Sequence, residues 1–192
     1  MRVRARKLAG PTEEEQLWRV QELERCKLDI SYWINKYCKT FDPRPENYPN
    51  HLDFKLYPFQ EDYIGWLEEC YRASRDGFAE KSREMGATWG GAAWLDHHWL
   101  FDDGFHALLG SRKEELVDKK GEPATLFWKL QYIIDRLPAW MQPFGWDPER
   151  HHTFMRILHP VNGNVLSGES ANRDFSRQGR YSVIWMDEFA FW

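Results

Sequence analysis

The stretch from Phe78 to Trp89, FAEKSREMGATW, limits the choice of fold more than any other part of the chain. It keeps the spacing of the phosphate-binding loop G-x-x-x-x-G-K-[ST], with Gly86 on the second glycine and Thr88 on the final hydroxyl. The lysine is displaced, because Lys81 stands on the first glycine and Ala87 takes the usual lysine position. A loop of this type joins a strand to a helix, so the spacing predicts an α/β fold.

The residue types in this stretch suit phosphate binding. Such a loop holds an anion with backbone amides, the positive end of the following helix and one ammonium group. Gly86 permits the sharp bend, and Lys81 would reach the same phosphates from the opposite side of the loop. Thr88, on the first turn of the helix, would offer its hydroxyl to Mg²⁺. Taken alone, the pattern also fits an ordinary strand-turn-helix connection.

A second pattern lies near the end of the sequence, where YSVIWMDEFA runs from Tyr181 to Ala190. An apolar run followed by two carboxylates predicts a buried parallel strand that delivers acids to its carboxyl end, where open α/β sheets bind ligands. Asp187 would hold the Mg²⁺ shell, and Glu188 would polarise a water for attack on the γ-phosphate. The competing interpretation is a strand that ends in a solvated acidic turn.

Together these segments resemble the ATPase domain of the large terminase subunit of tailed bacteriophages. Lys81 to Thr88 is similar to the Walker A loop of that family with its lysine displaced, and Val183 to Glu188 is similar to the Walker B strand. Tyr57 to Gln60, YPFQ, resembles the adenine motif upstream of the loop. Ser167 to Ala171, followed by Gly179 and Arg180, resembles the segment that leads into Walker B.

The resemblance implies a P-loop NTPase of the additional-strand catalytic-glutamate type, an α/β fold with a mainly parallel sheet flanked by helices. It also implies hydrolysis of ATP with Mg²⁺, coupled to packaging of double-stranded DNA into a procapsid. The catalytic residues would be Lys81 and Glu188, and the metal would be held by Thr88 and Asp187. The nucleotide would be bound by Gln60, Lys81, Ser82, Arg83, Gly86, Ala87 and Thr88.

Partners and location follow from the same resemblance. They are a portal protein, a small terminase subunit, further copies of the chain in a ring, and the host cytoplasm with the procapsid. Four arginines are candidates for a finger acting on a neighbouring subunit or for DNA contacts: Arg112, Arg173, Arg177 and Arg180. Internal pairing with Glu169, Asp174 or Glu188 is an equal alternative for Arg173, Arg177 and Arg180, and for Arg112 the alternative is a basic residue that caps a helix.

The expected organisation has two parts. Residues 1–50 form a helical segment with helices near 12–27 and 29–37 and a linker from Asp42 to Asn50, after a basic tail that carries Arg2, Arg4, Arg6 and Lys7. Residues 51–192 form a partial P-loop ATPase domain that stops just after Walker B, without a nuclease domain. We therefore expect a fragment, one product of a split gene or a remnant, in which the Walker B strand lacks one neighbour in the sheet.

Further elements are expected along this second part. They are a strand leading into the loop, a helix to about Leu100 with His97 and His98 on its surface, a strand at 105–110, a helix at 123–137 and a hairpin across Asn162 and Gly163.

Composition narrows the classes of protein. The 192 residues carry a formal net charge of -4, so any contact with DNA requires a local basic patch. The three cysteines lack C-x-x-C spacing, and no apolar run approaches membrane-spanning length. Two other functions stay open: a helicase-like DNA translocase, and a nucleotide- or portal-binding protein without turnover.

Overall fold

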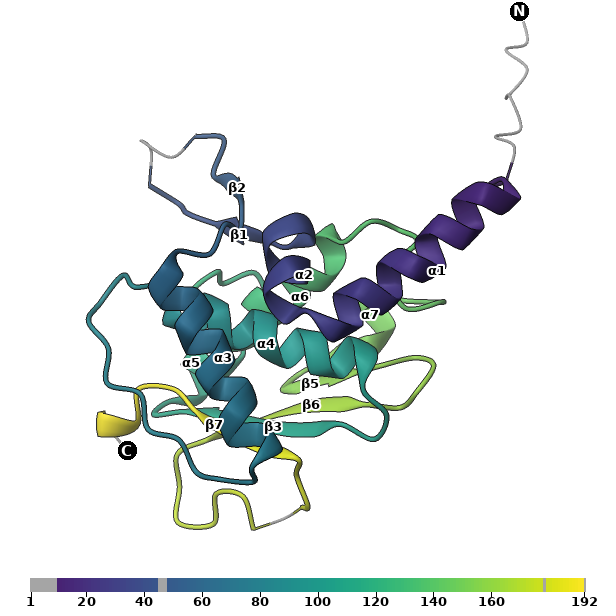
Figure 1. Ribbon diagram of the computed structural model, residues 1–192. Helices are drawn as coiled ribbons and strands as arrows, with labels where there is room; N and C mark the ends of the chain where they lie inside the picture. The colour runs from purple at the N-terminus through teal and green to yellow at the C-terminus, as the bar shows by residue number, and fades with distance from the viewer. Residues whose placement is uncertain (1–9, 45–47, 178, 192) are drawn as a thin grey trace, which may run out of the picture.

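The computed structural model describes residues 10–44, 48–177 and 179–191 (Figure 1). The basic tail with Arg2, Arg4, Arg6 and Lys7 lies outside the described residues. The helices are α1 (Glu13–Leu28), α2 (Ile30–Tyr37), α3 (Pro58–Arg72), α4 (Ala87–Phe101), α5 (Glu114–Val117), α6 (Leu126–Arg136) and α7 (Pro148–His151). The strands are β1 (Lys39–Phe41), β2 (His51–Asp53), β3 (His106–Ser111), β4 (His152–Thr153), β5 (Arg156–Leu158), β6 (Val165–Ser170) and β7 (Val183–Met186).

The central sheet is mixed, so the fold is α/β, and the expected parallel pairing is found on both sides of β3 but not at β5. Its order is β4-β5-β6-β3-β7, and β3 runs parallel to both β6 and β7. β5 is antiparallel to both of its neighbours, β4 and β6, so it runs against the direction of the other four strands. The β5–β6 pairing follows from the predicted turn at Asn162 and Gly163, because a short turn can join only antiparallel neighbours and Gly163 adopts a φ of 77° there.

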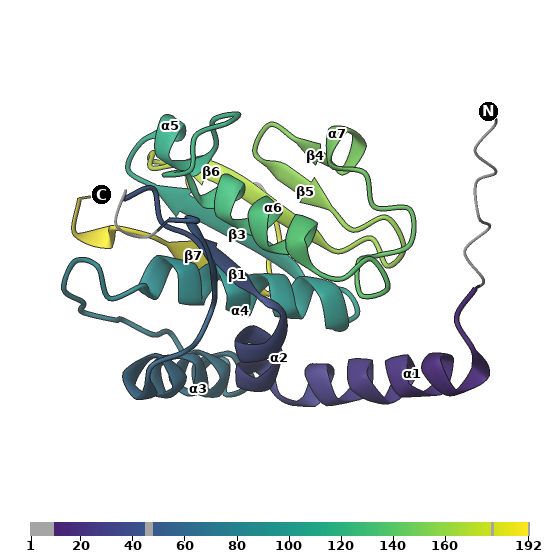
Figure 2. The same ribbon diagram turned by 90° about the horizontal axis from the view of Figure 1, so that it is seen from above.

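One face of this sheet is covered by α4 and α6, which pack side by side (Figure 2). Two glycines allow the close approach. A Cβ on Gly91 of α4 would lie 2.3 Å from the Trp185 ring of β7, and one on Gly168 of β6 would lie 2.8 Å from the Phe127 ring of α6. Leu126, Leu130, Ile133 and Ile134 of α6 are buried, at the three- and four-residue spacing of one helix face. α1, α2 and α3 form a further layer beyond α4 (Figure 2).

The first two helices begin at the side chains that the sequence indicates. Thr12 accepts a hydrogen bond from the backbone N–H of Glu15 at 3.2 Å, and Asp29 accepts one from that of Tyr32 at 2.8 Å. Trp33 of α2 is fully buried in the core shared with α4 and α6. The expected linker from residue 42 to residue 50 connects β1 to β2, which pair as an antiparallel ribbon.

The prediction that Val183 to Met186 is a buried strand is wrong. β7 stands at the edge of the sheet and is paired with β3 alone. Val183 and Trp185 pack onto the core, but Ile184 and Met186, on the opposite face, are 44% and 41% exposed.

The strand predicted to lead into the loop is absent. Residues 75–82 are irregular and exposed. A strand needs a hydrogen-bonding neighbour, and among the described strands none pairs with this segment. The loop therefore reaches α4 from an irregular, exposed segment.

Candidate functional site

The loop meets α4 at a glycine that has a conformation other residues avoid. Gly86 is the N-cap of α4, with a φ of 70°, and it provides no side chain to bond the helix amides. α4 has no acidic residue in its first turn. The first amides of a helix have no partner within the helix and carry its positive end, so this terminus suits an anion. Lys81, Ser82 and Arg83 are exposed on the approach to it.

Gln60, expected at the adenine, is buried beneath the loop. Its Oε1 accepts a hydrogen bond from the backbone N–H of Tyr57 at 3.0 Å, at the start of α3. Its Nε2 donates to the carbonyl oxygen of Met85 at 2.9 Å, directly before Gly86. Both ends of the amide are thus engaged with backbone, and only 7% of the residue is exposed.

Thr88 and Asp187 bring the two sequence patterns together. The hydroxyl of Thr88 donates to Oδ2 of Asp187 at 3.4 Å. Asp187 is fixed at the carboxyl end of β7 because its backbone N–H donates to the carbonyl oxygen of Gly110 in the neighbouring strand, at 2.9 Å. A hydroxyl and a carboxylate are the oxygen donors that Mg²⁺ prefers, so this pair fits the implied metal.

The electrostatics at Asp187 are set by burial and by three charged neighbours. Burial raises the pKa of this carboxyl above its ordinary value, and the Lys81 ammonium opposes that shift. Glu188 raises the pKa further, whereas Lys129 lowers it. A cation bound here would take the place of the proton that burial favours.

Lys129 is a residue of this site that the sequence analysis did not identify. Its ammonium donates to the carbonyl oxygens of Pro123, Ala124 and Thr125 at 3.1, 2.6 and 3.2 Å. It also lies 5.9 Å from the centre of the Trp89 ring on α4. Burial lowers the pKa of Lys129 to about 8, and the charge of Asp187 acts in the opposite direction. In the sequence it is indistinguishable from any lysine on the polar side of an amphipathic helix.

Glu188 is held beside Arg112, one of the four candidate arginines. Nε of Arg112 lies 3.5 Å from Oε2 of Glu188, and both side chains are close to half exposed. Glu188 adopts a φ of 53°, which turns the chain directly after β7. The next residue, Phe189, contacts Phe78 edge to face, with 6.3 Å between ring centres, so the segment before the loop lies against the segment after β7.

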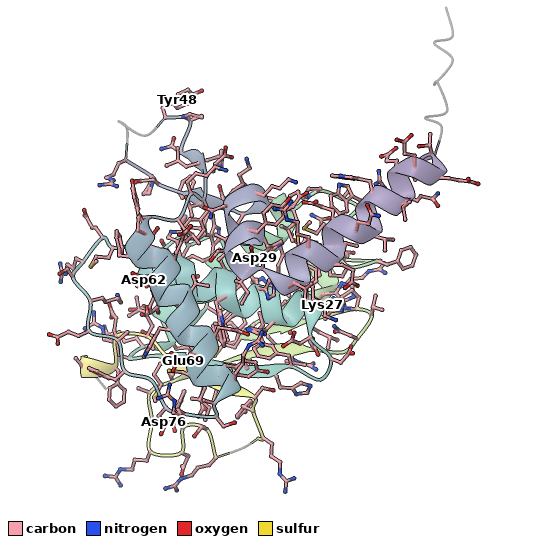
Figure 3. The ribbon with its side chains drawn as sticks, viewed as in Figure 1. Lys27, Asp29, Tyr48, Asp62, Glu69 and Asp76 are labelled. Carbon is pink, nitrogen blue, oxygen red and sulfur yellow. The ribbon has the colours of Figure 1, made fainter. Side chains whose placement is uncertain are left out.

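The other three arginines lie in the connection from β6 to β7, which runs below the sheet in the view of Figure 1. Arg177 pairs with Asp174 at 2.9 Å, which is the internal pairing left open by the sequence. Arg180 precedes the amino end of β7 and therefore lies at the opposite end of the strand from Asp187. Arg173 and Arg180 are exposed. The outer side of α3, in contrast, presents acids such as Asp62 and Glu69 (Figure 3).

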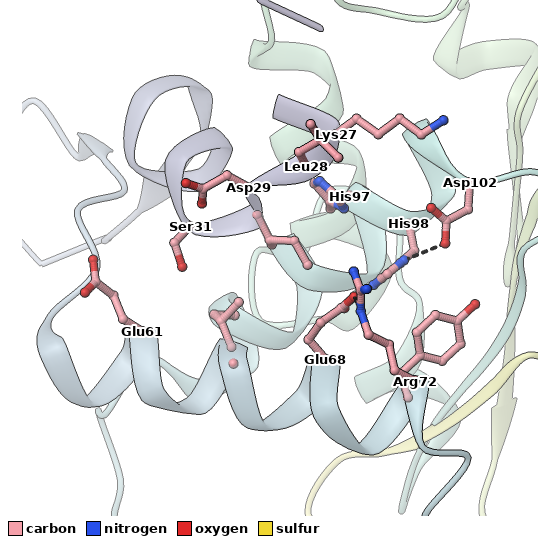
Figure 4. Close-up of a pocket in the computed structure, with 14 residues that line it drawn as sticks. Lys27, Leu28, Asp29, Ser31, Glu61, Glu68, Arg72, His97, His98 and Asp102 are labelled. Carbon is pink, nitrogen blue, oxygen red and sulfur yellow. Dashed lines mark hydrogen bonds and ion pairs between the residues drawn. The ribbon is translucent and has the colours of Figure 1, made fainter. Parts of the chain in front are cut away.

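A pocket of about 450 Å³ opens elsewhere, between the junction of α1 and α2, helix α3 and helix α4 (Figure 4). His98 lies in its wall, 2.9 Å from Glu68 and 2.7 Å from Asp102. The prediction that His97 and His98 lie on the helix surface is wrong, since they are 2% and 4% exposed. The reason is that α4 is enclosed by the sheet and α6 on one side and by α1, α2 and α3 on the other.

No protein-family model matches the sequence, so this comparison assigns the chain to no family. Within the described residues, no helix is both long and apolar enough to cross a membrane. The described part of the chain also contains no group of three His, Cys, Asp or Glu side chains arranged to hold a metal. Mg²⁺ held by Asp187 and Thr88 would complete its coordination with water or a bound ligand, as this ion does at many protein sites.

Proposed function

We propose that this chain binds ATP with Mg²⁺ at the start of α4, as a P-loop ATPase of the additional-strand catalytic-glutamate type. More narrowly, it would be part of a DNA-packaging motor of the large terminase kind. The observation that carries the proposal is the 3.4 Å contact between Thr88 and Asp187. It joins a glycine-capped helix start to an acidic strand end, and these are the two halves of a nucleotide site.

Each residue has a role in the proposed site. Lys81 neutralises the terminal phosphates, and the backbone amides around Gly86 and Ala87, with Ser82 and Arg83 beside them, hold the phosphate chain. Thr88 and Asp187 hold the metal, which supplies positive charge to the phosphate oxygens. Glu188 accepts a proton from the attacking water.

The proposed substrate and partners are those of a packaging motor. The exposed Arg173 and Arg180 would contact the phosphates of double-stranded DNA or the nucleotide of a neighbouring copy in a ring. Portal protein and small terminase subunit would complete the assembly, in the host cytoplasm and at the procapsid.

One observation favours a second function, nucleotide or portal binding without turnover. Glu188 is paired with Arg112 at 3.5 Å, so the proposed base is engaged with a cation. The edge position of β7 points the same way, because a strand with one partner holds Asp187 and Glu188 less firmly than a central strand would.

ATP binding and ATP turnover by the purified chain separate these functions. A motor predicts that Lys81→Ala abolishes binding and that Glu188→Gln abolishes turnover but not binding. Lys120→Ala, at a lysine paired with Glu149 on the surface, is the matched control and should change neither. Binding without turnover in the unmodified chain would support the second function. No binding at all, or binding that survives Lys81→Ala, would overturn the nucleotide site.

A further inference from the structure

The side chain of Gln60 links the start of α3 to the candidate phosphate loop through two hydrogen bonds to the backbone. It accepts from the N–H of Tyr57 at 3.0 Å and donates to the oxygen of Met85 at 2.9 Å. A glutamine amide has two N–H groups and one oxygen, and here the oxygen and one N–H are already used on backbone. Reading an adenine edge with both groups would require the buried side chain to give up these bonds.

The loop is shaped to fit this glutamine. A Cβ on Gly86 would lie 2.6 Å from Nε2 of Gln60, a distance that real Cβ atoms do not show. Gly86 also has a φ of 70°, which disfavours a side chain on separate grounds. The bend of the loop requires glycine here, and the close approach of the Gln60 amide also favours a residue without a side chain.

The bond to Met85 also sets the direction of a loop amide. The Met85 carbonyl and the Gly86 N–H belong to one planar trans peptide, in which the two groups point in opposite directions. Because the carbonyl oxygen points at Gln60, the N–H of Gly86 points away from Gln60 and α3. Fixing one end of the peptide therefore fixes the direction of the Gly86 N–H, which is one of the amides that the proposed phosphate site uses.

We propose that Gln60 is a positioning residue for the phosphate loop and does not select the base. The ligand part of this inference rests on the proposed nucleotide site, whereas the anchoring part depends only on the contacts of Gln60. A positioning residue acts on every ligand that the loop binds through phosphate. A base-reading residue acts on adenine nucleotides alone.

Three probes that share a triphosphate and differ in the base distinguish these roles: ATP, GTP and inorganic tripolyphosphate, each with Mg²⁺. Gln60→Met keeps the length of the side chain and removes both hydrogen bonds. We expect it to weaken binding of all three probes by the same factor, about tenfold for loss of one or two buried hydrogen bonds. A loss confined to ATP, or no loss for any probe, would overturn the proposal.

The matched control is Gln142→Met. Gln142 likewise donates to backbone carbonyls, those of Ile134, Asp135 and Leu137, but at the end of α6. It should lower stability without changing the affinity for any probe. If it weakens the three probes as much as Gln60→Met does, the effect of Gln60 is general loss of structure and the proposal fails.

Amide hydrogen exchange tests the anchoring without any nucleotide. Exchange at Gly86 and Ala87 should become faster in Gln60→Met and stay unchanged in Gln142→Met. Gln60→Glu is a second variant in case Gln60→Met does not fold: it keeps an acceptor for Tyr57 but sets a carboxylate against the Met85 carbonyl, and it should loosen the same amides. Unchanged exchange in the folded variants overturns the anchoring. If the unmodified chain binds none of the probes, the proposed function fails while exchange still decides the role of Gln60.

Discussion

Oγ1 of Thr88 lies 3.4 Å from Oδ2 of Asp187, although 99 positions separate the two residues in the sequence. One stands on the first turn of α4 and the other at the end of β7, so the contact depends on how the helix packs across the sheet. The packing is visible in the fit of Gly91 against Trp185. The candidate site is thus only as well formed as the interface between α4 and β7.

Removing the Thr88 hydroxyl should weaken metal-dependent binding of ATP. Thr88→Val keeps the shape of the side chain, and we expect about tenfold weaker binding of ATP with Mg²⁺, the size expected for one hydrogen bond to a charged group. Thr88→Ser retains the hydroxyl and should bind nearly as well as the unmodified chain. The measurement is an ATP titration with and without Mg²⁺, and equal losses in both would show that Thr88 does not act through the metal.

Adding one methyl group at Gly91 should disturb the same interface from the core. The new Cβ would meet the Trp185 ring at 2.3 Å, so α4 must shift away from β7. We expect Gly91→Ala to lower the free energy of unfolding by about 1 to 3 kcal/mol, as overpacked cores do. Gly65→Ala, on α3 with open space around it, should be neutral or stabilising by up to about 1 kcal/mol.

Urea denaturation measures both glycine variants, and a double variant tests the cause. If the Trp185 ring is what the methyl group meets, Trp185→Leu should remove much of the cost of Gly91→Ala. An equal cost of Gly91→Ala in both backgrounds would contradict the predicted clash.

Local signals in the sequence were enough to predict those parts of the fold that depend on neighbours along the chain. Thr12 and Asp29 start α1 and α2 because a capping side chain acts over three residues. The apolar residues of α6 face inward because their spacing follows the helical repeat, as Leu130 and Ile133 show.

The failures concern contacts between distant segments. The position of β7 in the sheet, central or at an edge, depends on which strands pair with it. The apolar sequence from Val183 to Met186 contains no information on the number of those neighbours. The sequence predicts His97 and His98 on the surface, because no residue pattern within α4 indicates that the helix is enclosed on both sides. Lys129 is part of the candidate site because the fold brings its ammonium near Trp89 and Asp187, which are distant in the sequence.

His98 should make stability depend on pH. Burial lowers its pKa, but the bonds with Asp102 and Glu68 outweigh burial and raise it above the ordinary value. Burial raises the pKa of Glu68, but the bonds from His98 and Arg72 dominate and lower it to about 2. The histidine contribution is complete below its ordinary pKa of 6.5 and is lost as the pH rises through the raised value. The glutamate contribution is present above its ordinary pKa of 4.5 and is lost as the pH falls toward about 2.

The ion pair should therefore stabilise most between these two ordinary values. His98→Gln should lower the free energy of unfolding by about 2 kcal/mol in that range, because it removes the charged partner of two partly buried carboxylates. The difference from the unmodified chain should shrink at higher pH. His106→Gln, at an exposed histidine, is the control for pH effects unrelated to the pair. Urea unfolding across this pH range measures both, and a constant cost of His98→Gln would mean that His98 is not charged in the fold.

Asp96 is expected to destabilise the folded chain at neutral pH. It is fully buried on α4, and neither carboxylate oxygen has a hydrogen-bond partner among the described residues. Burial raises its pKa well above the ordinary value, and the charge of Asp135 adds to the shift. The folded state thus holds this proton more tightly than the unfolded state does, so stability should fall as the pH rises above the ordinary value of 3.8.

Replacing Asp96 with an apolar residue of similar size should reverse this effect. We expect Asp96→Leu to raise the free energy of unfolding by about 1 to 3 kcal/mol at neutral pH, because it removes an unpaired polar group from the core. The gain should be smaller well below pH 3.8, where the acid is neutral in both the folded and the unfolded state. Asp103→Leu, at an exposed position just beyond α4, should show no such pH-dependent gain. A loss of stability in Asp96→Leu at every pH would mean that the fold needs the carboxyl group, and Asp96 would then be the next candidate for a functional role.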